Sequence, residues 1–384
     1  MFHVKQFSPL SSLGIYVHVP FCKHKCIYCD FYSLSLYGKN LDTNALMDRY
    51  TAALIARFWE HEGVPADTLY FGGGTPSTLG NRIGELVRAA KQVFAWKEPG
   101  EITVEVNPGQ ALSTLLTSAA EAGVNRVSIG LQSVNKGELN FLSRRHTAED
   151  VCATAHMARK AGIFNLSVDI MLGIPGQTAE SLRNTLDFCN SLGIGHVSAY
   201  ILKAEPGTLL FGQKENLPDD EQTAEFYLLA CEVLETNGLC QYEISNFARP
   251  GFECAHNLKY WRCEAYLGFG PAAHSFLFNS GSDGGTRFYQ TRSLTDFFAE
   301  TGQQEDGPGG DFAEFAMLAF RLTEGLERER ACARFQDGQK KFDAVYERAR
   351  KLTGTGLLKM DEHRIAFTPQ GFLVSNQLIG KLIL

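Results

Sequence analysis

Short β-branched runs alternate with longer amphipathic stretches in this sequence, and that pattern constrains the fold more than any other feature. The β-branched runs, which we expect to form strands, cover residues 14–19, 68–71, 102–106, 126–129, 166–171 and 196–202. The amphipathic stretches, which are long enough for crossover helices, cover residues 41–59, 79–94, 111–122, 148–161 and 178–192. Such an alternation predicts a parallel sheet. Six strands are fewer than the eight that close a TIM barrel, so we expect an α/β fold with a partial, TIM-like (βα)6 barrel.

Three cysteines with the spacing C-x3-C-x2-C follow the first predicted strand. Cys22, Cys26 and Cys29 lie at the carboxyl end of that strand, where barrels of this type carry their chemistry. Three thiolates can hold a [4Fe–4S] cube and leave its fourth iron open to another ligand. The spacing therefore predicts an iron–sulfur cluster with one reactive iron.

A structural zinc site is the alternative for the same cysteines. His18, His24 or Asp30 would then supply the fourth tetrahedral ligand. Zinc ligands usually come as two well-separated pairs, which this spacing does not provide. A disulfide is disfavoured because no leader with a basic segment and a long apolar segment precedes the motif, so we expect the chain in the reducing cytoplasm.

Neither a membrane span nor a nucleic-acid partner is expected. No run reaches the roughly 18 consecutive apolar residues of a transmembrane helix. The formal net charge of −7 gives no general attraction to a polyanion.

Three consecutive glycines follow the second predicted strand, in the run Gly72-Gly73-Gly74-Thr75-Pro76. Without Cβ atoms, the backbone can approach a ligand closely. The run lacks the Lys-Ser/Thr pair of a phosphate loop, and its spacing does not fit a dinucleotide fingerprint. By itself it would equally fit a tight turn.

Polar side chains stand at or after the ends of the next three predicted strands. They are Glu105, Gln132 with the following Arg144, and Asp169. A zwitterionic nucleoside needs such a set, since carboxylates or amides bind ribose hydroxyls and a guanidinium binds a carboxylate. Taken singly, each also fits an ordinary solvated residue at a strand end.

In this order, the motifs resemble the radical S-adenosylmethionine (SAM) superfamily, and within it the oxygen-independent coproporphyrinogen III oxidase family with its heme-chaperone relatives. The resemblance implies that Cys22, Cys26 and Cys29 hold a [4Fe–4S] cluster. It also implies an electron donor, because one electron splits the SAM sulfonium in this superfamily. The residues that it places around SAM are Tyr16, Tyr28, Gly73, Gly74, Thr75, Glu105, Gln132, Arg144 and Asp169.

Phe31 separates the two branches of this family. The oxidases carry a fourth cysteine at this position, whereas the heme chaperones read Cys-Asp-Phe, as this chain does, although Ile27 replaces their usual proline. The resemblance therefore implies a heme chaperone, which binds heme and passes it to an acceptor protein, without coproporphyrinogen III oxidase activity. The alternative is a radical SAM enzyme acting on a tetrapyrrole, by oxidative decarboxylation or by radical methylation and ring opening.

The run His256-Asn-Leu-Lys-Tyr260-Trp261 resembles the His-Asn-x-x-Tyr-Trp motif of the heme chaperones. Imidazole is a common axial ligand of heme iron, so His256 is a candidate heme ligand, with Cys254 and His274 as further candidates. The equally weighted alternative is structural: His256 would only form hydrogen bonds, and the aromatic rings would pack on the barrel.

The chain of 384 residues divides into three predicted parts. Residues 1–278 form the barrel, with its strand-end loops and the proposed heme motif. Residues 279–311, rich in Gly, Asp and Gln, are predicted as a flexible connection. Residues 312–384 resemble the C-terminal domain of the same family, a small α+β module with a winged-helix-like shape.

Overall fold

The computed structural model describes residues 12–36, 42–109 and 112–383. The first residues of the predicted stretches 41–59 and 111–122 lie outside the described residues, as does the segment before residue 12.

All six predicted barrel strands are present. They are β1 (Leu13–Val19), β4 (Pro65–Gly73), β5 (Ala95–Val106), β6 (Arg126–Gln132), β7 (Asn165–Leu172) and β8 (His196–Ile201). They pair in chain order, each parallel to the next, which confirms the predicted α/β fold with a partial barrel. Every residue of β6 is buried, as expected for a strand covered on both faces.

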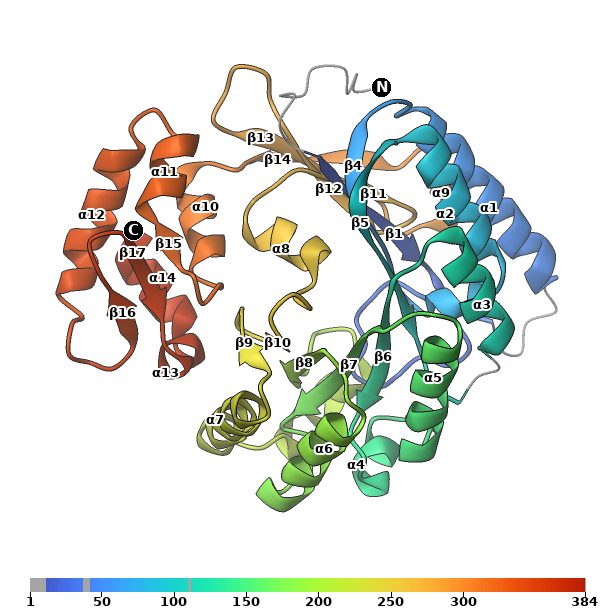
Figure 1. Cartoon of the computed structure of the whole chain (residues 1–384), viewed down its shortest axis with the longest axis horizontal. Coiled ribbons are helices and arrows are strands. Elements are labelled where there is room, and N and C mark those ends of the chain that lie inside the picture. Colours follow the sequence, from blue (N-terminus) through green and yellow to red (C-terminus); the bar gives the residue numbers. More distant parts are fainter. Residues whose placement is uncertain (1–11, 37–41, 110–111, 384) are drawn as a thin grey trace.

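Helices cover the outer face of the curved sheet (Figure 1). The five predicted ones are α1 (Thr43–Trp59), α2 (Arg82–Val93), α3 (Ser113–Ala122), α5 (Ala148–Lys160) and α6 (Ala179–Ser191), and the short helix α4 (Lys136–Phe141) was not predicted. Thr147 and Thr178 begin α5 and α6 with capping boxes, which satisfy free backbone N–H groups. The predicted stretch 79–94 is shorter as a helix, because the 3-10 helix η1 (Pro76–Leu79) ends at Gly80 with φ +60°.

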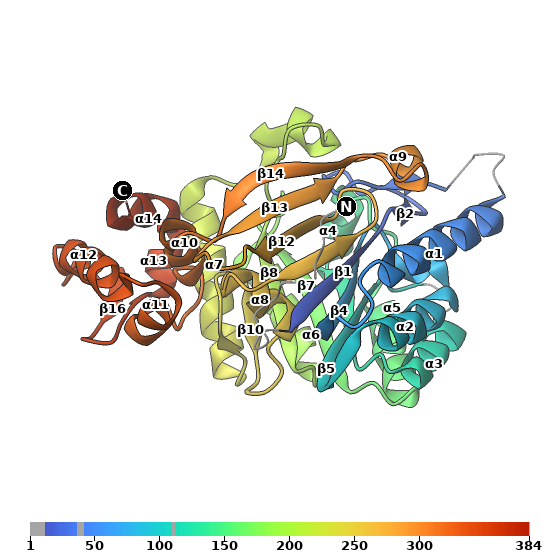
Figure 2. The same ribbon diagram turned by 90° about the horizontal axis from the view of Figure 1, so that it is seen from above.

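Both edges of the parallel sheet are extended. β11 (Tyr266–Phe269) pairs with β1, and β12 (His274–Phe278), β13 (Gly285–Gln290) and β14 (Gln303–Gly309) follow as antiparallel strands (Figure 2). At the other edge, β10 (Asn246–Ala248) and β9 (Cys240–Gln241) continue the sheet beyond β8. The two outermost strands of this sheet, β14 and β9, do not pair with each other, so the barrel remains open.

The prediction of a flexible connection over residues 279–311 is wrong for most of that segment. It contains β13, the helix α9 (Leu294–Phe298) and β14. β14 has a strongly polar, mostly exposed sequence because it is an edge strand that faces solvent, and its backbone hydrogen bonds to β13 replace the missing hydrophobic pattern.

The C-terminal part is the predicted small α+β module. Its helices are α10 (Phe312–Ala319), α11 (Arg328–Arg334), α12 (Gly338–Arg350), α13 (Pro369–Leu373) and α14 (Ser375–Ile383). Three short strands, β15 (Leu326–Glu327), β16 (Leu358–Met360) and β17 (Arg364–Phe367), form its sheet. Its core is continuous with that of the barrel.

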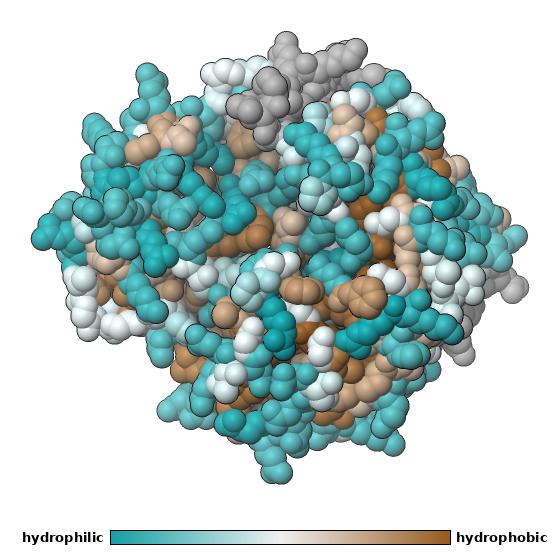
Figure 3. Space-filling view, in the orientation of Figure 1, coloured by the Kyte–Doolittle hydropathy of each residue, from teal (hydrophilic) through white to brown (hydrophobic). Residues whose placement is uncertain are grey.

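The surface in the orientation of Figure 1 is mostly hydrophilic, with apolar side chains showing between the C-terminal module and the barrel (Figure 3). None of the helices in the described part of the chain combines the length and apolar character needed to cross a membrane.

Candidate functional site

The cysteine loop is closed at its base by two short parallel strands. β2 (Phe21–Cys22) pairs with β3 (Leu34–Ser35), and the backbone N–H of Leu36 donates to the carbonyl of Cys22 at 2.9 Å. Inside the loop, the N–H of Cys29 donates to the carbonyl of Cys26 at 3.3 Å. Cys22 is buried, whereas Cys26 and Cys29 are half-buried. The loop therefore carries all three thiols beside the carboxyl end of β1.

The three motif thiols do not form a ready-made single-ion site in the described part of the chain. Among the described residues, no three His, Cys, Asp or Glu side chains converge on one point where a metal ion would fit. A [4Fe–4S] cube does not need such convergence, because each thiolate binds a different iron. Burial raises the pKa of Cys22, and it raises that of Cys29 to about 11. Metal binding must therefore displace protons from these groups.

The glycine run brings β4 close to the cysteine loop. A Cβ atom on Gly74 would lie 2.8 Å from the carbonyl oxygens of both Val19 and Phe21, and 3.1 Å from the sulfur of Cys22. The N–H of Gly74 donates to the Val19 carbonyl at 2.8 Å, and Gly73 adopts φ +103°. Gly74 is therefore required by packing against the loop itself, in addition to any contact with a ligand.

Two carboxylates face the barrel interior near the carboxyl ends of the parallel strands, which we call the mouth of the barrel. The Tyr70 hydroxyl donates to Glu105 at 2.8 Å, and the Ser128 hydroxyl donates to Asp169 at 3.0 Å. Burial, with the nearby charge of Asp169, raises the pKa of Glu105 to about 8. Burial also raises the pKa of Asp169. The charge of the buried Arg126 opposes part of the rise in both pKa values, so the pair forms a hydrogen-bonding wall with a guanidinium nearby.

Arg144 bridges the cysteine loop and β6. Its Nη2 donates to the Gly130 carbonyl at 2.7 Å, and its Nη1 lies 3.6 Å from the sulfur of Cys26. A Cβ atom on Gly130 would lie 2.5 Å from Nη2, so only glycine leaves room for the guanidinium. Gly130 begins the run Gly130-Leu-Gln132-Ser at the end of the fourth predicted strand, and its position opposite Arg144 explains why that run begins with glycine.

Two buried polar atoms beside this arrangement have no partner. They are Nε of Arg144 and Oε1 of Gln132, a residue that the chain holds at φ +66°. An unsatisfied buried polar atom costs roughly 1–3 kcal/mol, so such atoms mark where a polar ligand fits. A cavity of about 250 Å³ is lined by Arg144 itself, together with Cys26, Thr75 and other residues.

The two tyrosines expected at the site lie at different depths. Tyr28 packs beside a small apolar cluster formed by Leu142, Ile174, Leu202 and Leu210, and it lies near Cys26. Tyr16 points into the barrel, where its hydroxyl is 3.1 Å from Nδ1 of His18 and its ring stacks on Tyr70. The structure therefore gathers Tyr28, Thr75, Gln132 and Arg144 around the mouth and places Tyr16 further inside.

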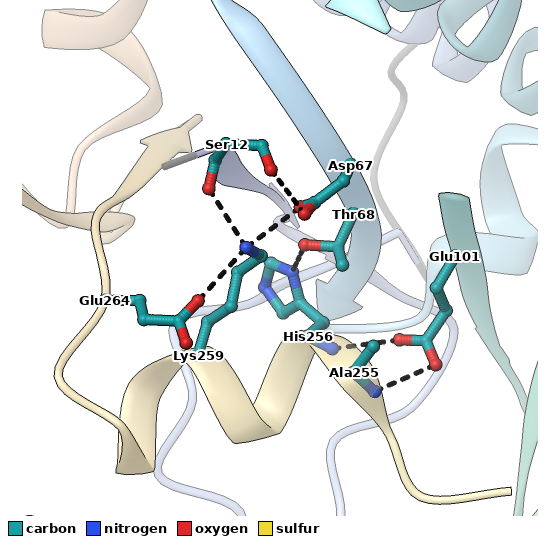
Figure 4. Close-up of polar contacts among 8 residues, drawn as sticks. All are labelled: Ser12, Asp67, Thr68, Glu101, Ala255, His256, Lys259 and Glu264. Carbon is teal, nitrogen blue, oxygen red and sulfur yellow. Dashed lines mark hydrogen bonds and ion pairs between the residues drawn. The ribbon is translucent and has the colours of Figure 1, made fainter. Parts of the chain in front are cut away.

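The His-Asn-x-x-Tyr-Trp run forms a helix inside the opposite end of the barrel. This helix, α8 (Ala255–Trp261), lies on the inner side of the sheet (Figure 1). The Glu101 carboxylate accepts the backbone N–H groups of Ala255 and His256, both at 3.0 Å (Figure 4). Because Glu101 and Thr68 precede Glu105 and Gly73 on their strands, α8 contacts the amino ends of the strands, away from the cysteine loop.

Both ring nitrogens of His256 are engaged within the protein. Nδ1 lies 2.8 Å from the Thr68 hydroxyl, and Nε2 lies 2.8 Å from the Tyr260 hydroxyl. Only 1% of the residue is exposed, and burial lowers its pKa to about 3, so the ring stays neutral. In this conformation neither nitrogen faces an open site, which favours the structural interpretation of the motif over heme ligation.

Lys259 holds α8 in place through ion pairs and a hydrogen bond. Its ammonium group is 2.9 Å from Asp67 and 3.3 Å from Glu264, and it donates to the Ser12 carbonyl at 3.0 Å (Figure 4). The thiol of Cys254, a further candidate heme ligand, is buried and lies 3.4 Å from Glu101. Of the three candidate heme ligands, only His274 is exposed, with its ring stacked on Tyr289.

The fold and the mouth of the barrel define a radical SAM protein. The model of the radical SAM superfamily matches residues 16–189, and that of the HemN C-terminal domain matches residues 312–374. In structure, the chain is similar to the coproporphyrinogen III oxidase HemN of Escherichia coli, with a TM-score of 0.79, 22% identity, and coverage of 97% of this chain and 90% of that one.

The most informative relatives in sequence are curated heme chaperones. The chain is 33% identical to heme chaperone HemW of Bacillus subtilis, over 96% of this chain and 98% of the relative. It is 32% identical to heme chaperone HemW of Mycobacterium tuberculosis, over 98% and 96% of the two chains. The chain therefore belongs to the HemW family.

Proposed function

We propose that this protein is a heme chaperone, which binds heme and passes it to an acceptor protein, and which carries a [4Fe–4S] cluster and SAM at the mouth of its barrel. The observation that carries the proposal is the match to heme chaperones over nearly the whole length of both chains. A shared barrel alone would not distinguish a chaperone from an enzyme, because one fold supports many functions.

Cys22, Cys26 and Cys29 would hold the cluster, which offers an open iron and passes on an electron when it is bound. The packing of the glycine run against the cysteine loop supports this assignment, since it fixes the loop next to the cavity. Under this proposal, the electron comes from a separate donor protein.

The polar groups at the mouth would hold SAM. Arg144 has a free Nε beside the cavity and would bind the methionine carboxylate, and Gln132 would donate to or accept from the same ligand. Glu105 and Asp169 would accept hydrogen bonds from ribose hydroxyls. The remaining proposed contacts are backbone and side-chain groups of Tyr16, Tyr28, Gly73, Gly74 and Thr75.

Phe31 favours the chaperone over an oxidase. The side chain is 59% exposed beside the cysteine loop, so solvent or another molecule faces a phenyl ring where the oxidases carry a fourth cysteine. We place this function in the cytoplasm, because all ten cysteines lie in the described residues and none forms a disulfide.

Anaerobic reconstitution followed by two assays tests the proposal. We expect about four irons and four sulfides per chain, a Soret band on addition of hemin, and transfer of that heme to an apo-heme protein. Formation of protoporphyrinogen from coproporphyrinogen III, with SAM and a reductant, would overturn the chaperone assignment in favour of a tetrapyrrole enzyme.

A further inference from the structure

A second cavity lies beside the cysteine loop. Its volume is about 500 Å³, and the described residues that line it include Lys25, Arg144 and Arg145 and no carboxylate. The smaller cavity of about 250 Å³ shares Arg144 and Arg145 with it and adds Lys23. Lys23, Lys25 and Arg145 are exposed, and the proposed SAM contacts do not use them. These three cations therefore need a role of their own.

The three exposed cations have no anionic partner within the described part of the chain. No Asp or Glu side chain there forms an ion pair with Lys23, Lys25 or Arg145. Nη1 of Arg145 lies 3.4 Å from Nε2 of His24, and an imidazole leaves the positive charge of the guanidinium uncompensated. In a chain with a net charge of −7, this group creates a local positive potential at the cysteine loop.

Two carboxylates neighbour these cations without outweighing them. Asp150 lines the smaller cavity and accepts the backbone N–H of Thr147 at 2.9 Å, as part of the capping box of α5. Asp30 is exposed in the cysteine loop, and Arg292 donates to its backbone carbonyl. Because Arg292 is itself exposed, it adds a fourth cation beside Asp30. The charge around the cysteine loop is therefore positive on balance.

Exposed apolar side chains gather at the same end of the barrel. Four of the seven large apolar side chains that are exposed in the described residues lie on the cysteine loop, at the end of β8 or on the segment after it: Phe31, Tyr200, Leu209 and Phe211. The 3-10 helix η2 (Leu209–Asn216) is tied to the loop, because the N–H of Leu210 donates to the Ile27 carbonyl at 2.9 Å. Apolar side chains rimmed by charged ones are typical of a surface that binds another protein.

Phe31 connects this surface to the cysteines. Its side chain is exposed, whereas its backbone forms a hydrogen bond to the thiol of Cys29. Cys26 and Cys29 are half-buried, so the proposed cluster would lie directly behind the surface. A protein that docks here therefore approaches the cluster through the cysteine loop, without crossing the barrel.

We propose that the surface formed by Lys23, Lys25, Arg145 and Phe31 docks an acidic one-electron carrier protein. The inference rests on the proposed function, because it names the surface that receives the donor of the cluster electron. The carrier is oxidised by one electron, the cluster is reduced by one electron, and no covalent bond forms or breaks in that step. Opposite charges speed the encounter, and the exposed phenyl ring excludes water once the two proteins meet.

Charge reversals test the inference in the cluster-loaded full chain. Lys23→Glu and Arg145→Glu each reverse one charge of the docking surface, whereas Lys23→Arg keeps the charge. Phe31→Ser removes the exposed ring. Lys340→Glu is the matched control, since Lys340 is exposed on α12 of the C-terminal module, and Figure 2 shows α12 and β2 at opposite ends of the molecule.

The probe is an acidic [2Fe–2S] ferredoxin, a one-electron carrier of low potential. Calorimetry measures its binding at several salt concentrations, and we expect the wild type to lose affinity as salt rises, because salt screens exposed charges. Lys23→Glu and Arg145→Glu should each weaken binding about tenfold at low salt, equivalent to about 1.4 kcal/mol. Lys23→Arg and Lys340→Glu should bind like the wild type, and Phe31→Ser should bind more weakly at every salt concentration.

Rates of cluster reduction separate docking from damage to the cluster. With reduced ferredoxin as the donor, Lys23→Glu and Arg145→Glu should be reduced more slowly than the wild type. With reduced methyl viologen, a small cation that needs no docking surface, they should be reduced at least as fast. Iron and sulfide contents equal to those of the wild type show that each variant still holds its cluster.

The outcomes separate this inference from the function on which it rests. If the reconstituted wild type holds no iron and sulfide, the proposed function fails and the inference falls with it. If the cluster forms but the wild type neither binds ferredoxin nor is reduced by it, or if Lys23→Glu and Arg145→Glu match the wild type in both measurements, the inference alone is overturned. Unchanged ferredoxin binding with loss of heme transfer to an apo-heme protein would also overturn it, by showing that the surface docks the heme acceptor.

Discussion

Thr68 of β4 and His256 of α8 are hydrogen-bonded inside the barrel, with 2.8 Å between Oγ1 and Nδ1, although 188 positions separate them in the chain. The bond joins the innermost helix to the amino end of a central strand. It also occupies one nitrogen of the imidazole, while Tyr260 occupies the other. His256, the histidine of the His-Asn-x-x-Tyr-Trp run, is thereby part of the internal packing.

His256→Ala should therefore destabilise the fold. The substitution leaves the hydroxyls of Thr68 and Tyr260 without their buried partner, and each unsatisfied group costs roughly 1–3 kcal/mol. Urea unfolding measures the loss, and the folded fraction should keep the wild-type Soret position with hemin. Thr68→Val, which removes only one of the two bonds, should cost less. A shifted Soret band in stably folded His256→Ala would instead identify this residue as a heme ligand.

Loss of any one motif cysteine should prevent cluster assembly. Cys22→Ser, Cys26→Ser and Cys29→Ser should each lower bound iron from about four atoms per chain to nearly none, because three thiolates are needed to hold the cube. Iron and sulfide analysis after anaerobic reconstitution gives the result. Cys332→Ser is the control, since Cys332 is exposed on α11 of the C-terminal module. A stoichiometric zinc without sulfide in the wild type would exclude the cluster.

Gly130→Ala should impair SAM binding while leaving the cluster in place. The added methyl group would lie 2.5 Å from Nη2 of Arg144 and must push the guanidinium away from Gly130 and Cys26. We expect affinity for SAM, measured by anaerobic calorimetry, to fall about tenfold, equivalent to about 1.4 kcal/mol. Gly212→Ala provides the control, because a Cβ atom there meets nothing within 4 Å. If Gly130→Ala and Gly212→Ala bind SAM with equal affinity, the proposed contact between Arg144 and SAM is wrong.

The Glu105 carboxyl should make the stability of the SAM-free protein fall as pH rises. Burial raises its folded-state pKa to about 8, above the unfolded value of about 4.3. Between these values the folded state holds the extra proton, so this contribution is complete below the unfolded pKa and is lost as pH rises through the folded pKa. Denaturant unfolding at several pH values, with Glu105→Gln as the reference, isolates the effect. The difference between the two proteins should shrink toward low pH, and a difference independent of pH would contradict the assignment.

Local sequence patterns were sufficient to predict the barrel strands and the cysteine loop. The alternation of β-branched runs with amphipathic stretches specifies which face of each element is buried, and crossover helices leave few arrangements other than a parallel sheet. The cysteine spacing is equally local, because Cys22, Cys26 and Cys29 lie in one loop whose ends are closed by β2 and β3.

The position of α8 and the strands within residues 279–311 were decided only by tertiary structure. Sequence chemistry showed that His256 can bind iron or donate and accept hydrogen bonds, but not that Thr68 would face its ring. The polar β14 gave no hydrophobic pattern, because its order comes from backbone pairing with β13. Each of these features depends on contacts between distant segments, whose free energy appears only once the sheet has brought those segments together.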